Sequence, residues 1–479
     1  MPSQVSRSAT LLVVCAAHFL MPFMMSAVGV ALPAIGREFS ATALQLGLIE
    51  TTYVMSASIF LLAMGRLGDI HGRRRVFQYG IVVFTLAGGA ISLAWSIETL
   101  LVLRFLQGMG GAMVMATTLA MLTSVFPPAE RGKALGIATA TVYAGISCGP
   151  FLGGLLVTEL GWRWIFYLCV PLGITTFLIT WARLRGDWAE ARGEPFDWRG
   201  SLLYAAALLL LISGAAHLDR GLWAWVATAT GVAGIGLFLA VEARTPYPIL
   251  SISLLRDNRV FALSNLAALF NYAATFGVTF FLSLYLQYVK GLNAREAGTV
   301  LIIQPLVQTL LSPWCGRLAD RYPAARVATI GMTLCAGGLA VAATLSSATP
   351  LPVVMAMLAL LGTGFALFSS PNASVIMGSV APRHLGVASG LNSSMRTLGM
   401  MTSMSIITVT FSMLMAGHPV TVATLPQFLL SMRTALLVFC ALCGVGILCS
   451  AGRLKTCATG EKTICHQATK PPPKTDDDD

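Results

Sequence analysis

Long apolar runs recur along the whole chain and are separated by short polar segments. Each run is close to the roughly 20 residues that a helix needs to cross about 30 Å of hydrocarbon. The runs lack the strict alternation of barrel strands, and lipid admits only helices or closed barrels as spanning structures. The pattern therefore predicts an all-α membrane protein with fourteen transmembrane helices, at about 9–35, 43–64, 76–95, 99–124, 134–158, 164–182, 200–218, 223–241, 260–287, 297–315, 327–347, 351–376, 387–416 and 432–451.

Composition agrees with this interpretation and charge adds an orientation. Of the 479 residues, 56% are hydrophobic and 11% are charged, whereas soluble domains carry about 25% charged residues. If the N-terminus lies inside, the inner loops and tails hold 23 Lys and Arg and the outer loops hold 6. By the positive-inside rule both termini are then cytoplasmic. The net charge of +11 thus reflects topology and excludes a nucleic-acid partner. We expect an integral protein of the plasma membrane, which in bacteria is the inner membrane.

Two polar loops repeat and divide the chain into halves. Gly65–Arg75 reads GRLGDIHGRRR after the second predicted span, and Gly316–Arg326 reads GRLADRYPAAR after the tenth. Matching loops at the same end of two helices are typical of transporters built from internal repeats. The predicted organisation is a six-helix half at 1–184, an inserted helix pair with linkers at 185–259, a second six-helix half at 260–453 and a disordered cytoplasmic tail at 454–479.

One acid lies well inside a predicted span. Glu50 is the only charged residue between Leu46 and Met64, and a carboxylate in hydrocarbon costs about 2.5–3.5 kcal/mol. At 1.5 Å per residue, Glu50 and Arg104 each lie roughly 10 Å from the outer ends of their helices. A buried arginine requires a carboxylate or carbonyl partner. We therefore expect Glu50 and Arg104 to meet.

Motifs of other protein classes are missing from the sequence. It contains no phosphate-binding loop, hydrolase serine motif, channel filter or zinc pattern. Cys457, Cys465 and His466 near the C-terminus could bind a metal, but three ligands in a flexible tail are a weak signal. We expect a protein that is not an enzyme and that holds no metal or other cofactor.

Several stretches together resemble the major facilitator superfamily. The loop Gly65–Arg75 resembles its loop signature, Leu100–Ala112 resembles its fourth-helix motif, and Gly145–Gly154 is similar to the fifth-helix motif of its antiporters. Shorter matches extend the resemblance to the fourteen-span drug:proton antiporter (DHA2) group; they are Trp162–Phe166, Phe196–Trp198, Tyr285–Gln287 and Ser370–Asn372.

The resemblance implies a conformational latch at the loops. In the family, this loop stabilises one face of alternating access. The residues implied here are Gly65, Asp69, Gly72 and Arg73, with Asp320 at the corresponding place in the second half. Ile70 stands where an arginine is common in the family. The alternative role for the loop arginines is anchoring to anionic lipid.

The fifth-helix motif predicts close packing and a kink. Small residues four apart allow helices to approach closely, and a proline removes one backbone hydrogen bond. Such a helix can seal and flex between the halves, or it can serve packing alone. The residues concerned are Gly145, Gly149, Pro150, Gly153 and Gly154.

The first helix departs from the family pattern. Relatives usually have an Asp where this chain has Met24, and often an Asn where it has Gly29. That Asp contributes to proton coupling in the family, and the family also places Arg104 in the coupling region. Two roles remain open for Glu50. It is either the proton carrier, relocated by one helix, or the structural counter-ion of Arg104.

Polar residues within the spans are candidates for substrate contact. A few placed polar groups orient a ligand in an apolar cavity, although such groups also pair between helices. No acid lies in the spans neighbouring Arg396. The candidates are Tyr53, Asn271, Gln304, Gln308 and Arg396.

Together these features predict a monomeric secondary transporter that works by alternating access. The family implies export of amphipathic or cationic drugs against an inward flow of H⁺. An alternative is an exporter of metabolites or lipid that is uncoupled or coupled differently, since the first-helix acid is missing. A more remote alternative is a sensor or scaffold on the same fold that transports nothing.

Overall fold

The structure, a computed structural model, describes residues 6–41, 43–184, 186–215, 221–415 and 424–458. These residues form helices joined by short connections and include no β-strand, as predicted. The last helix, α17 (Leu425–Ala458), extends into the segment predicted to be a disordered tail. Cys465, His466 and the rest of that tail lie outside the described residues.

The first half contains six helices that match the first six predicted spans. All of these helices except α3 are longer than the apolar runs that predicted them. Their bounds are α1 Arg7–Phe39, α2 Ala43–His71, α3 Arg73–Ile91, α4 Ile97–Val125, α5 Pro128–Glu159 and α6 Arg163–Arg183. Local sequence sets some of these starts: Ser6 and Ser96 each accept a hydrogen bond from a backbone N–H in the first turn of their helix.

The inserted pair and the second half follow in the predicted order. The pair consists of α7 (Trp198–Ala215) and α8 (Leu222–Glu242). A short helix, α9 Ile252–Asp257, lies in the linker that follows the pair. The second half contains α10 Arg259–Thr275, α11 Val278–Leu284, a π-helical turn Tyr285–Val289, α12 Ala294–Leu301, α13 Ile303–Arg321, α14 Ala324–Ala343, α15 Leu351–Gly378, a 3₁₀ turn Pro382–His384, α16 Leu385–Met415 and α17.

The ninth predicted span is interrupted near Gly277. The backbone N–H of Gly277 donates to Ser403 Oγ at 2.9 Å. A Cβ at Gly277 would lie 2.7 Å from Ile407 Cδ1. This close approach to α16 explains why a glycine stands between α10 and α11.

Twelve of the described helical segments are long and apolar enough to cross a membrane, which makes the chain an integral membrane protein. The sequence predicted fourteen spans. The two that fall short of this criterion are α3, which opens with three arginines, and α13, which carries Gln304, Gln308 and Pro313. Both helices are present at the predicted places, but their apolar content is lower because they carry these polar residues.

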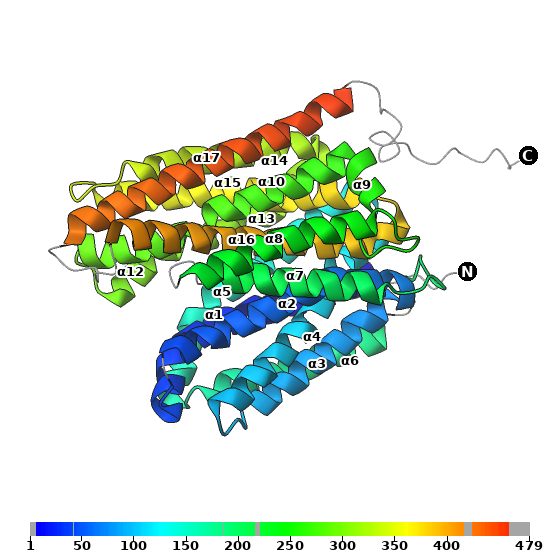
Figure 1. Ribbon diagram of the computed structural model, residues 1–479, viewed down its shortest axis with the longest axis horizontal. Helices are drawn as coiled ribbons and strands as arrows, with labels where there is room; N and C mark the ends of the chain where they lie inside the picture. The colour runs from blue at the N-terminus through cyan, green and yellow to red at the C-terminus, as the bar shows by residue number, and fades with distance from the viewer. Residues whose placement is uncertain (1–5, 42, 185, 216–220, 416–423, 459–479) are drawn as a thin grey trace, which may run out of the picture.

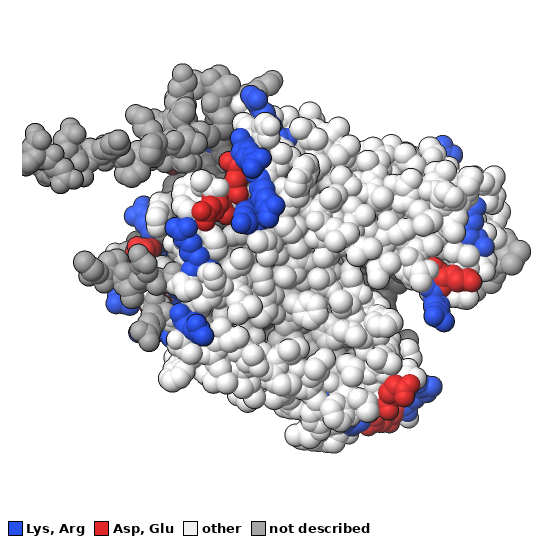
Figure 2. Space-filling view, turned by 180° about the vertical axis from the view of Figure 1, so that it is seen from behind, with Lys and Arg blue, Asp and Glu red and all other residues white. Residues whose placement is uncertain are grey.

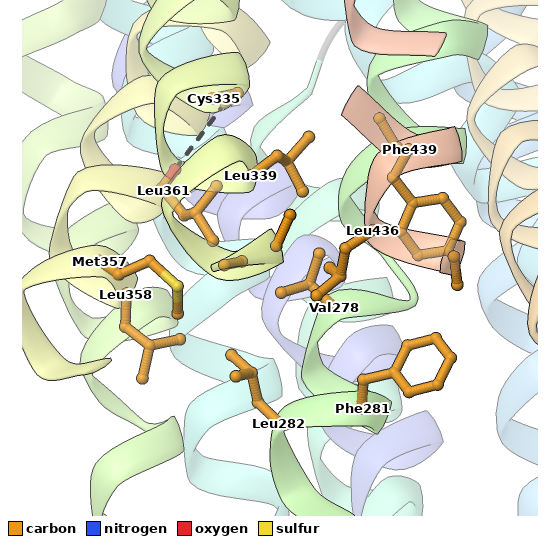
Figure 3. Packing of buried hydrophobic residues seen from close by; sticks show 14 of the residues in the cluster. Val278, Phe281, Leu282, Cys335, Leu339, Met357, Leu358, Leu361, Leu436 and Phe439 are labelled. Carbon is orange, nitrogen blue, oxygen red and sulfur yellow. Dashed lines mark hydrogen bonds between the residues drawn. The ribbon is translucent and has the colours of Figure 1, made fainter. Parts of the chain in front are cut away.

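The helices form two bundles with separate apolar cores. One core, around Phe23, Phe84 and Phe166, lies in the first half. The other lies in the second half, where side chains from α11, α14, α15 and α17 interdigitate (Figure 3), among them Val278, Leu339, Leu361 and Phe439. In a membrane, such side chains stabilise each half through close van der Waals packing, because lipid tails are as apolar as the side chains themselves.

The inserted pair joins the halves along one side. A third cluster includes Leu62 of α2, Leu208 of α7, Phe238 of α8 and Leu391 of α16. In Figure 1, α7 and α8 lie in front of the seam between the halves, beside α2 and α16. The pair therefore packs as part of the bundle.

The bundle has two different ends. The helix α1 begins and α17 ends at the same end, on the right of Figure 1, which we call the terminal end. At the opposite end the space-filling view shows a recess between the two halves, on the right of Figure 2. The halves are thus in contact toward the terminal end and separated at the other.

Candidate functional site

The first of two contacts that close the terminal end is built on Asp69, near the end of α2. Its carboxylate accepts hydrogen bonds from the backbone N–H groups of Gly386 at 2.9 Å and Val387 at 3.0 Å, in the first turn of α16. The unpaired N–H groups and the dipole of a helix N-terminus favour a negative charge. We call this contact, together with Arg73, the first junction. It joins the two halves.

Arg73 completes the first junction. Its guanidinium donates to Asp69 Oδ1 at 2.9 and 2.6 Å, to Ser124 Oγ at 2.8 Å and to the carbonyl oxygen of Pro382 at 2.5 Å. Asp69 and Arg73 are both fully buried. One guanidinium thus connects α2, α4 and the segment that precedes α16.

The second junction repeats this geometry with the halves exchanged. Asp320, near the end of α13, accepts hydrogen bonds from the backbone N–H groups of Gly132 at 2.6 Å and Lys133 at 2.8 Å, near the start of α5. Position 324, the first residue of α14, corresponds to Arg73 and is an alanine. The second junction therefore has the helix-end contact without the buried guanidinium.

Glycines allow the helices to cross closely at both junctions. A Cβ at Gly65 would lie 2.4 Å from the carbonyl oxygen of Gly386, and one at Gly316 would lie 2.1 Å from that of Gly132. Atoms at these separations overlap, so any side chain would push the helices apart. Gly72 has a different role: its φ of +109° lies in the left-handed region and allows the turn from α2 into α3.

A connecting segment, residues 186–197, covers the first junction. Its Glu194 forms an ion pair with the buried Arg66, and its Asp187 forms one with Arg75 at 2.8 Å. The backbone N–H of Arg73 donates to the carbonyl oxygen of Trp188 at 3.1 Å. Burial raises the pKa of the Asp187 carboxyl, an effect that Arg75 opposes. Sequence reasoning missed this segment because it contains no regular element.

Glu50 and Arg104 are neighbours, but their charged groups are not bonded. Arg104 is fully buried; its Nε donates to the carbonyl oxygen of Ile49 at 3.1 Å and its Nη1 to Gln107 Oε1 at 2.8 Å. Its guanidinium carbon lies 4.5 Å from the centroid of the Tyr53 ring.

The Glu50 side chain is partly exposed, but one of its carboxyl oxygens is buried. Glu50 Oε1 has no hydrogen-bond partner among the described residues, and no carboxylate there lies within 4.0 Å of Arg104. Glu50 Oε1 lies 3.7 Å from the position that a Cβ would take at Gly29 of α1. The predicted pairing of the two charged groups is not formed in this structure, and the Arg104 guanidinium bonds to the backbone carbonyl of Ile49, the residue before Glu50. A buried carboxyl oxygen without a donor fits the protonated form of Glu50.

A small central cavity of about 60 Å³ lies between the two halves. It is lined from α1, α4 and α5 of the first half and from α10, α15 and α16 of the second. His18 lines it and is held by Thr118 Oγ1 at 2.9 Å and the carbonyl oxygen of Ala138 at 3.3 Å. Tyr143 and Tyr272, one from each half, pack edge-on against Phe365.

Of the five candidates for substrate contact, Arg396 lines this cavity. Tyr53 stacks on Arg104 instead, Asn271 is fully buried in α10, and Gln304 and Gln308 are buried in α13. A lone tyrosine or histidine in an apolar span carries little signal, so sequence reasoning missed the roles of Tyr143 and His18 in the lining.

The glycines of the fifth-helix motif pack inside the first half. A Cβ at Gly145 would lie 2.5 Å from the Phe19 carbonyl oxygen, and one at Gly149 would lie 2.5 Å from Ser26 Cβ. Gly153 similarly faces Ala27. The motif therefore holds α5 against α1, and α5 continues through Pro150 to Glu159. Of the two roles that the sequence left open, a seal between the halves or packing alone, the glycine contacts with α1 match packing.

Comparisons with known proteins agree with this architecture. The sequence profile of the Major Facilitator Superfamily matches residues 14–404. The crystal structure of the human organic anion transporter MFSD10 (TETRAN) superposes with a TM-score of 0.69 at 14% identity and covers 93% of this chain and 99% of that one. This likeness concerns the fold.

Sequence relatives are transporters. The chain is 29% identical to the riboflavin transporter RibZ of Clostridioides difficile, over 81% of this chain and 84% of that protein. It is 32% identical to the multidrug resistance protein Stp of Mycobacterium tuberculosis, over 78% and 70%. It is 32% identical to the cephamycin export protein CmcT of Amycolatopsis lactamdurans, over 88% and 89%. These matches support a small-molecule transporter and not an enzyme, as predicted, and the chain belongs to the Major Facilitator Superfamily.

Proposed function

We propose that this protein is a proton-coupled exporter of amphipathic small molecules that works by alternating access. The observation that carries the proposal is the pair of equivalent junctions, which close the bundle at the terminal end while a recess separates the halves at the other (Figure 2). Each junction joins one helix from each half, so both must break when the terminal end opens. The names of relatives, which include multidrug resistance and antibiotic export, support export as the direction.

We assign the terminal end to the cytoplasm. The predicted 23-to-6 distribution of basic residues supports this orientation. In it, α3 and α13 also cross the membrane, which gives the fourteen spans of the drug:proton antiporter group, and the protein acts as a monomer in a bacterial inner membrane. The structure then represents an outward-open state, and the loop residues of both halves act as conformational latches.

We assign proton transport to Glu50. Its buried and unpartnered carboxyl oxygen supports a proton-carrying role, since ionisation at this position requires a partner. The Arg104 guanidinium is held nearby by the carbonyl oxygen of Ile49. After the proton leaves, the carboxylate can take up Arg104. The switch between these two partners couples protonation to the position of α2 against α4.

The test is Glu50→Gln, which keeps the shape and removes the proton exchange. We expect the purified variant to fold and bind substrate, and to lose export of a fluorescent dye driven by a pH gradient in proteoliposomes. The matched control is Glu98→Gln, an exposed acid near the start of α4. Undiminished gradient-driven export by Glu50→Gln would overturn the assignment of the carrier.

The uncoupled exporter is the second candidate, because Met24 stands in the apolar core of the first half where relatives usually keep an acid. Its discriminating outcome is dye export that is insensitive to a proton uncoupler in the wild-type protein. The scaffold alternative predicts no export of any dye in either condition.

A further inference from the structure

We infer that the central cavity takes amphipathic anions, with Arg396 of α16 as the residue that binds the carboxylate. This inference rests on the proposed function and specifies the charge of its substrate. It departs from the cationic substrates that the sequence resemblance implied.

Arg396 is a cation without a partner in the middle of the bundle. It lies eleven residues from the start of α16, or roughly 16 Å along the helix. Its guanidinium forms no ion pair with the described residues, and its Nε is buried without a hydrogen-bond partner. Arginine stays protonated in proteins. A permanent charge at this depth is expensive unless an anion or a fixed dipole compensates it.

The buried arginines of the described bundle differ from Arg396, which is partly exposed. Arg66 has Glu194, Arg73 has Asp69, Arg104 has a backbone carbonyl and an aromatic face, and Arg453 has Ser264 and Asn372. Each of these cations is compensated within the protein. Arg396 is the one that lines the cavity, so we infer that its compensating group comes with the substrate.

The rest of the lining favours an anion with an aromatic or other apolar body. The described lining residues include no carboxylate, and Arg396 is their only permanent charge. A cationic ligand would meet this charge with nothing to offset it. The rings of Tyr143, Tyr272 and Phe368 offer apolar contact around the guanidinium. A carboxylate can accept two parallel hydrogen bonds from a guanidinium, which a hydroxyl or an amine cannot do.

The volume of the cavity indicates when binding occurs. About 60 Å³ corresponds to roughly two water molecules, whereas drug-sized ligands occupy about 300–1,000 Å³. In the state described here the guanidinium is therefore solvated by water at most. Substrate must therefore bind in a state in which the halves have moved apart at the cavity. The return to the small cavity described here leaves no room for the substrate and so displaces it.

The experiment compares three probes that share one ring system and differ in charge: 1-naphthylacetate, 1-naphthylmethanol and 1-naphthylmethylammonium. Binding to the purified full-length protein in nanodiscs is measured at neutral pH for the wild type, Arg396→Gln and Arg396→Lys. Arg433→Gln is the matched control, because it removes an exposed arginine far along the chain from the cavity residues.

We expect the wild type to bind the anion at least tenfold more tightly than the alcohol, and the ammonium probe most weakly. Arg396→Gln should weaken anion binding by about 30-fold or more, the range for truncating one partner of a buried charge pair. It should change alcohol binding by less than about threefold. Arg396→Lys should retain part of the affinity, because the charge remains but the paired geometry is lost. Arg433→Gln should bind like the wild type.

Two results would overturn the inference. One is saturable binding of the ammonium probe that equals or exceeds that of the anion; the other is anion binding that is unmeasurable in the wild type or unchanged by Arg396→Gln. Either result leaves proton-driven dye export intact if the proposed function is right. Conversely, a loss of export in every assay with Arg396-dependent anion binding preserved would contradict the proposed function alone.

Discussion

The two junctions at the terminal end share one backbone geometry, but the first has more polar contacts and is more deeply buried than the second. At each, an aspartate near the end of one helix accepts hydrogen bonds from two backbone N–H groups near the start of a helix from the other half, beside a crossing of two glycines. Asp69 is fully buried and is held by Arg73, whereas Asp320 is half-buried and has Ala324 at the position of that arginine. Only the first junction is covered by residues 186–197.

This difference indicates how much each junction stabilises the closed terminal end. The backbone geometry is common to both, so both must open for the halves to rock. The charge network is confined to the first, so breaking it leaves a buried cation without a partner. We expect the second junction to open more readily and the first to determine how long the closed state lasts.

The largest loss of transport should follow from substituting the glycines at which the helices cross in both junctions. Gly386→Val and Gly132→Val each place side-chain atoms where a Cβ would already lie 2.3 Å from the carbonyl oxygen of the facing glycine. Either change should prevent closure of the terminal end and reduce transport at least tenfold. Gly337→Val is the control, since a Cβ there meets nothing within 4 Å. Normal transport by either junction variant would show that the crossings need not be tight.

The next prediction separates the junctions by charge. Asp69→Asn leaves Arg73 buried without its anion, at a cost of about 3–5 kcal/mol. Asp320→Asn loses charge-assisted hydrogen bonds to two backbone N–H groups, at a cost of about 1–3 kcal/mol. Transport and thermal unfolding should therefore both be affected more by Asp69→Asn. Equal effects of the two variants would remove the proposed asymmetry.

A third prediction identifies the origin of the asymmetry. Adding Arg73→Met to Asp69→Asn removes the stranded cation, and replacing both members of a buried ion pair by neutral groups is often close to neutral. The double variant should therefore unfold at a higher temperature than Asp69→Asn alone, with a coupling energy of about 1–3 kcal/mol in the cycle. Additive effects would mean that Asp69 acts only through the backbone of α16.

The smallest effect should come from making the second junction resemble the first. Ala324→Arg introduces a guanidinium at the first residue of α14, the counterpart of Arg73 at the first residue of α3. We expect a gain of about 0.5–1 kcal/mol for the partly exposed pair with Asp320 and a transport rate a few-fold lower, because the closed state lasts longer. Faster transport by this variant would contradict the proposed role of Arg73.

The sequence predicted the helices and the equivalent aspartates better than it predicted which residues these side chains contact. The repeated Gly-Arg-Leu-small-Asp stretch identified Asp69 and Asp320 as equivalent. It could not identify Gly386 or Gly132, because a helix start in the other half leaves no mark beside the aspartate. The depth calculation put Glu50 and Arg104 at one level, but depth does not fix the direction of a side chain around its helix. As a result Arg104 bonds to the carbonyl of Ile49.

The structure differs from the sequence-based expectations at two further places, because polar contacts between distant segments leave no pattern in the sequence. Arg453 follows the last predicted span, 432–451, and counts among the 23 inner basic residues; the structure buries it in α17, where it donates to Ser264 Oγ at 2.7 Å and Asn372 Oδ1 at 2.6 Å. Ion pairs hold the connecting segment 186–197 against the first junction, and no hydrophobic periodicity in the sequence predicts them. Hydrophobic patterning reports which residues face lipid or core, and it is silent on polar contacts between segments distant in sequence.

Our central proposal is that both junctions close the terminal end, which we assign to the cytoplasm, and that the first junction is the stronger. Its most direct test is the reactivity of a cysteine at Thr139, which lines the central cavity, toward a membrane-impermeant maleimide added from the cytoplasmic side of inside-out vesicles. The native cysteines are replaced in this background. We predict slow labelling in the parent, much faster labelling with Asp69→Asn and a smaller increase with Asp320→Asn. Labelling that stays slow with Asp69→Asn, or that rises more with Asp320→Asn, would contradict the account.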